Sequence, residues 1–175
     1  TGADYTDDSV QREYRRVSFN DGVLSIVRRL LRVNRRGILL FSRFVEEAQY
    51  ISDSLPGMAA IVSQNTPKKE RERILADFKA GRIKVVTNVG VLTTGFDYPE
   101  LDTVVLARPT LSLALYYQMV GRAIRPHPSK AEGWIVDLCG NFNRFGRVED
   151  LQLASYKPGT YCIQNRTRVL TNVYM

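Results

Sequence analysis

The run Gly37-Ile-Leu-Leu-Phe41 is short, continuously apolar, and bounded by its own glycine and by Ser42. Such a run predicts a strand of a parallel sheet that is buried on both faces. Helix-like and strand-like segments alternate along the rest of the chain, which is typical of a parallel sheet covered by helices. The expected fold class is therefore α/β, with helices on both sides of a mainly parallel central sheet.

Further segments extend this pattern from the central run. Asp21 is expected to cap the first helix after the N-terminal region, and Thr66 is expected to cap a later helix that has Pro67 at its first position. The expected additional strands span residues 58–62, 83–87, 103–107 and 134–138. The expected helices span residues 22–34, 44–54, 67–81 and 113–120.

The boundaries follow from where this alternation starts and stops. One domain is expected over residues 20–147, after a linker or domain edge at residues 1–19. Residues 148–175 form an extension that stays unassigned, because the pattern weakens there and only the turn at Pro158-Gly159 is clear.

Composition limits the partners. The chain has 175 residues and a formal net charge of +7, which suits a partner that carries phosphates. The early arginine clusters fit either a binding surface or a solvated helix face. Cys139, Cys162 and the single His127 lack metal-ligand spacing, so no metal site is expected. Two reduced thiols and no membrane-length apolar stretch predict a cytoplasmic protein without a membrane partner.

Polar residues that follow strands are the places to look for ligand contacts in an open α/β sheet. The first such segment is Phe41-Ser42-Arg43, where the Ser42 hydroxyl can donate to a phosphate or simply cap the next helix. The second runs from Thr87 to Pro99, and its glycines let main-chain amides approach phosphates. Within it, Asp97 can accept a hydrogen bond from a ribose hydroxyl or cap a local turn.

The third segment, Gln118-Met-Val-Gly-Arg122-Ala-Ile-Arg125, is the most specific. Its two arginines are three residues apart and are expected near one face of a helix, with Gly121 allowing close packing at the turn. Such a pair can present guanidinium groups to a phosphate held by another domain, or it can form surface salt bridges.

Two parts of a complete ATPase are missing from the sequence. It contains no Gly-x-x-x-x-Gly-Lys-Ser/Thr phosphate loop, and no strand ends in an Asp-Glu pair able to hold Mg²⁺. The chain can therefore complete an ATP site but cannot build one, and this fragment alone is expected to be inactive.

The three segments, in this order, resemble motifs IV, V and VI of the C-terminal RecA-like domain of superfamily-two helicases. The resemblance covers roughly residues 20–147 and implies a RecA-like α/β/α sandwich. Gly-Arg-Ala-Ile-Arg-Pro, followed by the segment from Asp137 to Gly146, is most similar to the bacterial RadD (YejH) family of DNA-repair helicase-like ATPases. Thr94 and Ile124 depart from the DEAD-box pattern, and both departures favour a DNA translocase.

The resemblance also implies roles for individual residues. Arg125 would be the arginine finger, with Arg122 as its companion. The residues implied in ATP binding are Gln118, Gly95 and Asp97, and those implied in holding the nucleic-acid backbone are Ser42, Thr87 and Thr94.

The expected function is that of the second motor domain of an ATP-dependent DNA helicase or translocase in DNA repair. ATP and Mg²⁺ would be bound mainly by an N-terminal RecA-like domain of the same full-length protein, and DNA is favoured over RNA as the partner. Three alternatives stay open: a nucleic-acid-binding module uncoupled from ATP, half of an RNA helicase, and an unrelated nucleotide-binding α/β protein. The last of these should carry a glycine-rich loop after its first strand, and Ser42-Arg43-Phe44 is not one.

Overall fold

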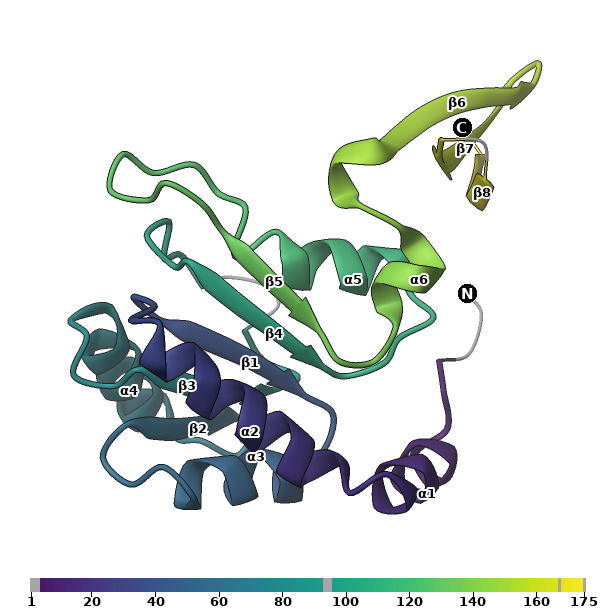
Figure 1. Cartoon of the computed structure of the whole chain (residues 1–175). Helices are drawn as coiled ribbons and strands as arrows, with labels where there is room; N and C mark the ends of the chain where they lie inside the picture. The colour runs from purple at the N-terminus through teal and green to yellow at the C-terminus, as the bar shows by residue number, and fades with distance from the viewer. Residues whose placement is uncertain (1–3, 93–95, 167, 175) are drawn as a thin grey trace.

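The structure, a computed structural model, describes residues 4–92, 96–166 and 168–174 (Figure 1). Its centre is a five-stranded sheet with the order β2-β3-β1-β4-β5, in which every neighbouring pair is parallel. The strands are β1 (Ile38–Ser42), β2 (Ala59–Ser63), β3 (Val85–Val89), β4 (Thr103–Ala107) and β5 (Trp134–Asp137). The predicted parallel sheet is confirmed, with the predicted central run as its middle strand.

Helices cover both faces of this sheet, because alternate residues of β1 enter two different cores. Leu39 and Phe41 pack with residues of α4 and α5, whereas Ile38 and Leu40 pack with residues of α2 and α3. The bounds of these helices are α2 (Phe19–Arg32), α3 (Val45–Asp53), α4 (Lys68–Lys79) and α5 (Leu113–Val120). This is the three-layer α/β/α sandwich expected from the sequence.

Two of the predicted helix caps are wrong. Helix α2 begins at Phe19 after Ser18, so Asp21 lies in its first turn, where it accepts a 2.6 Å hydrogen bond from the Tyr50 hydroxyl. A carboxylate in that turn is still favourable because of the positive end of the helix dipole. The N-cap position of α4 is occupied by Pro67, and the Thr66 hydroxyl instead accepts from the main-chain N–H of Ser63 at 2.9 Å.

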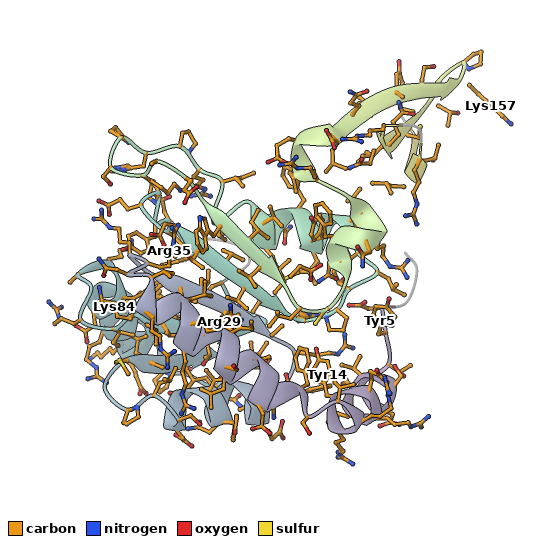
Figure 2. The ribbon with its side chains drawn as sticks, viewed as in Figure 1. Tyr5, Tyr14, Arg29, Arg35, Lys84 and Lys157 are labelled. Carbon is orange, nitrogen blue, oxygen red and sulfur yellow. The ribbon has the colours of Figure 1, made fainter. Side chains whose placement is uncertain are left out.

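The N-terminal region, expected to be a linker, contains helix α1 (Asp7–Arg16). The side chain of Thr6 caps it by accepting from the Ser9 N–H, and the acidic first turn and basic last turn both suit the helix dipole. Tyr14 attaches the helix to the domain: its ring stacks on Phe19, and its hydroxyl donates to the Ala107 carbonyl at 2.9 Å. Figure 2 shows Tyr14 beside the loops at the carboxyl ends of the strands.

The C-terminal extension folds into a separate antiparallel sheet of order β6-β7-β8. It follows α6 (Asn141–Phe145) and the short 3-10 helix Val148–Asp150, and its strands are β6 (Leu151–Lys157), β7 (Thr160–Asn165) and β8 (Arg168–Tyr174). The predicted turn at Pro158-Gly159 joins β6 to β7, and Gly159 has a φ of +74° that favours glycine. In Figure 1 this sheet projects away from the layered domain.

Candidate functional site

Two of the residues singled out in the sequence lie in strands of the parallel sheet. Ser42 is the last residue of β1 and is 2% exposed, whereas Thr87 lies inside β3 and is 0% exposed. The Thr87 hydroxyl donates to the main-chain carbonyls of Ala48 and Ala60, at 3.2 and 3.4 Å. Because the Thr87 hydroxyl is buried and already bonded to main-chain carbonyls, this geometry argues against the nucleic-acid contact expected of Thr87.

The loop after β3 turns sharply and then presents Asp97. The side-chain oxygen of Asn88 accepts from the main-chain N–H groups of Val91 and Leu92, which fixes the start of the turn. Thr94 and Gly95 lie outside the described residues. Phe96 and Tyr98 are both buried against Phe78, so the residue between them points outward, and the Asp97 side chain is 74% exposed.

The arginine segment lies beside this loop, although not on a helix as predicted. Helix α5 ends at Val120; Arg122 lies in the turn that follows, and Arg125 lies in irregular backbone after that turn. Gly121 closes the helix: its N–H donates to the Tyr117 carbonyl at 2.8 Å, and a Cβ at this position would lie 3.0 Å from that oxygen. Gln118 lies on the exposed face of α5. The expectation of two arginines on one helical face is wrong, because the helix stops before either of them.

The turns nevertheless bring the two segments together. Arg122 Nη1 donates to the Phe96 carbonyl at 2.7 Å, and Arg125 Nη1 donates to the Asp97 carboxylate. Burial lowers the pKa of Arg122, the nearby charge of Arg125 lowers it further, and Asp97 opposes the shift. The Arg125 side chain is 40% exposed, so its ion pair with Asp97 contributes at most about 1 kcal/mol. Arg125 can therefore exchange this carboxylate for another anion at little cost.

A second basic group, which was assigned no role from the sequence, lies where β1 and β4 end. Arg43 forms ion pairs with Asp4 and Asp7 of the N-terminal segment, and Arg108 lies 3.9 Å from the same Asp4 carboxylate. Burial lowers the pKa of Arg108, and the charge of Arg43 adds to that effect. The position of Arg43 and Arg108, each directly after a strand, could have been recognised in the sequence as a candidate ligand contact. Nothing in the sequence indicates that the N-terminal segment pairs with these two arginines.

Neither a metal centre nor a membrane span is found in the part of the chain that the structure describes. Among these residues, no group of three or more His, Cys, Asp or Glu side chains is placed to hold a metal ion. No helix within the same residues has the length and apolar character needed to cross a membrane.

Comparisons with known proteins identify related sequences and a shared fold. The chain is 32% identical over 146 residues to the 51.5 kDa protein of Lactococcus phage (isolate 7-9). The aligned residues are 82% of this chain and 31% of that protein. This chain is 42% identical over 79 residues to the putative ATP-dependent helicase IRC3 of Saccharomyces cerevisiae, covering 45% of this chain and 12% of that one. The structure of the E. coli DEAD-box protein SrmB shares the fold, with a TM-score of 0.59 at 17% identity over 69% of this chain and 71% of that one.

The chain spans less than a third of the length of these two curated relatives. Residues 22–127, which are more than half of it, match the family described as the helicase conserved C-terminal domain. This match contains the ends of β1 and β3, the Asp97 loop and both arginines. The chain belongs to the helicase conserved C-terminal domain family.

Proposed function

We propose that this chain is the second RecA-like motor domain of an ATP-dependent DNA helicase or translocase. The observation that carries the proposal is the pairing of Arg122 and Arg125 with the Phe96–Asp97 turn, which gathers two guanidinium groups and one exposed carboxylate at a single edge. Guanidinium groups are suited to phosphate oxygens, and a carboxylate is suited to ribose hydroxyls. The residues present therefore fit one side of a nucleotide.

The remainder of that nucleotide site belongs to an N-terminal RecA-like domain of the full-length protein. Bound ATP, with its Mg²⁺, supplies the phosphoryl group whose transfer to water drives the motor. Arg122 and Arg125 neutralise charge that develops on the terminal phosphate. To reach the phosphate, Arg125 breaks its ion pair with Asp97. Asp97 then accepts from the ribose, while Gln118 and Gly95 support the nucleotide from the neighbouring segments.

For the nucleic acid, we propose contacts at the ends of the strands. Ser42 and Thr94 would contact the nucleic-acid backbone. Arg43, next to Ser42, would exchange its present partners Asp4 and Asp7 for phosphate oxygens. Thr87 supports this edge from inside the sheet. Contacts of this kind read little sequence, so binding should be salt-sensitive and largely independent of sequence. Opening and closing of the two motor domains would then move the protein along the strand.

The finer assignment is to a RadD-like role in DNA repair. It rests on Gly121–Pro126 followed by Asp137–Gly146, and on the sequence departures from the DEAD-box pattern. A cytoplasmic location accords with Cys139 and Cys162, which are both free thiols.

The test is ATP hydrolysis by the full-length parent protein, measured without nucleic acid, with DNA and with RNA. We expect DNA to stimulate turnover most. Arg125→Ala should reduce the stimulated turnover about a thousandfold while ATP binding is retained. Arg82→Ala is the matched control, since Arg82 also forms an exposed ion pair with a single aspartate, Asp77. Stimulation by RNA alone would indicate half of an RNA helicase. ATP turnover that is the same with and without nucleic acid would favour a binding module that is uncoupled from ATP.

A further inference from the structure

The loop that carries both arginines lacks regular secondary structure of its own. It leaves α5 at Gly121 and reaches β5 only at Trp134. Its two ends pass close to each other: a Cβ at Gly133 would lie 2.3 Å from the Ala123 carbonyl oxygen. The positions of the guanidinium groups therefore depend on contacts made by the loop, because no helix or strand sets them.

Lys130 makes a concentrated set of such contacts. Its ammonium nitrogen donates to the carbonyl oxygens of Pro99, Leu101 and Ala123, each at 2.9 Å. An ammonium group has three N–H donors, so this arrangement uses all of them. Burial lowers the pKa of Lys130 and the Asp102 carboxylate opposes the shift, so the ammonium is held partly away from water beneath the loop.

The three carbonyls belong to the two segments proposed to contact the nucleotide, the loop that carries the arginines and the loop that carries Asp97. Ala123, which is fully buried, stands between Arg122 and Arg125, whereas Pro99 and Leu101 follow Asp97. Lys130 thus joins both segments through their main chains. The Arg125 bond to Asp97 joins the same segments through side chains, and it must break if Arg125 is to reach a phosphate. The contacts of Lys130 need not change in that step.

We propose that Lys130 is a positioning residue for the two arginines: it holds the arginine loop on the Asp97 loop while Arg125 exchanges its carboxylate for phosphate. This inference rests on the proposed function of Arg125. Lys130 acts through main-chain carbonyls and does not touch the nucleotide, so its loss should lower kcat more than it changes the KM for ATP.

The first experiment replaces Lys130 in the full-length parent protein. Lys130→Met keeps the length of the side chain and removes all three donors. We expect the DNA-stimulated kcat to fall about 10- to 100-fold, because small misplacement of a catalytic group has effects of that size. Lys130→Arg should lose less, since a guanidinium can still donate to carbonyls. Lys69→Met, at an exposed lysine of α4, is the matched control and should keep the wild-type kcat.

A double variant separates positioning from general destabilisation. If Lys130 acts through the two arginines, then Lys130→Met should lower kcat less in the Arg125→Ala background than in the wild type, because only Arg122 is left to position. An equal loss in both backgrounds would overturn the inference. Should Lys130→Met fail to fold, Lys130→Gln carries the test, because its amide has two donors and a shorter reach. A reduced kcat with an unchanged melting temperature supports the proposal, and a wild-type kcat contradicts it.

The two proposals fail in different ways. If Arg125→Ala leaves turnover unchanged, the proposed role of Arg125 in ATP hydrolysis is wrong, whatever the effect of Lys130→Met. If Arg125→Ala collapses turnover while Lys130→Met keeps a wild-type kcat, only the positioning role of Lys130 is wrong.

Discussion

The parallel and antiparallel sheets of this chain are stabilised in different ways. All five residues of β1 are buried, and its four apolar residues enter two cores between the sheet and its helices. In the β6-β7-β8 sheet, Leu153 and Val169 are 63% and 45% exposed, and the sheet projects from the domain with Lys157 near its far end (Figures 1 and 2). Burial of apolar area therefore dominates the first sheet, whereas main-chain pairing and a few polar attachments hold the second.

The largest expected effect tests this contrast in burial. Phe41→Ala removes a side chain that is 1% exposed from the middle strand and should cost about 3–5 kcal/mol of unfolding free energy. Leu153→Ala, in β6, should change it by less than about 0.5 kcal/mol. Urea denaturation of both variants measures the difference, and similar losses would contradict the contrast.

A smaller effect is expected from Glu47, a carboxyl group buried in α3. Burial raises its pKa to about 7, although N–H groups of Phe44 and Arg43 favour the charged form. Since the folded pKa lies above the unfolded value, its contribution is fully present below about pH 4.5 and is lost as pH rises through about 7. Glu47→Gln should therefore be more stable than wild type at pH 8, by about 1–3 kcal/mol.

The measurement for Glu47 is the melting temperature between pH 4.5 and 8. Glu72, an exposed glutamate of α4, provides the control, because Glu72→Gln should keep the wild-type pH dependence. An unchanged pH dependence in Glu47→Gln would show that water reaches this part of the layered domain.

The smallest effect concerns the attachment of the antiparallel sheet. Asn165 donates from its side-chain amide to the carbonyls of Phe145 and Arg147, at 3.0 and 2.8 Å. Asn165→Ala should lower the opening free energy of β6–β8 by about 1 kcal/mol, and leave the parallel sheet unchanged. Hydrogen exchange of the two sheets is the readout, with Gln164→Ala on the same strand as control. Faster exchange throughout the molecule would mean that the two sheets do not open separately.

The same contrast explains what the sequence could predict. Continuous apolar runs such as Val104–Leu106 indicate buried parallel strands without further context. The strands β6 to β8 were not predicted, because few of their described side chains enter a core and the alternation of their apolar residues is weak. Helix α1 was missed for a related reason: within it, Val10 is the buried residue, and Tyr14 attaches the helix to β4 through a contact between residues far apart in sequence.

At the candidate site, residue identity was easier to predict than geometry. The spacing of Arg122 and Arg125 indicated a shared task, yet α5 ends at Val120, before both of them. Thr87 matched a motif position, while its burial depends on the packing of α3 and β2, which the sequence alone does not show. Lys130 could not be assigned a role, because its three partners come from two segments that meet only in the folded chain.

The central claim is that Arg125 acts on a nucleotide held by another domain. Single-turnover hydrolysis by the DNA-bound full-length protein tests it most directly, with ATP binding measured in parallel for wild type and Arg125→Ala. Nearly unchanged binding and a hydrolysis step slowed by about a thousandfold would support the claim. Hydrolysis at the wild-type rate would contradict it and leave the Arg125–Asp97 pair as a surface salt bridge.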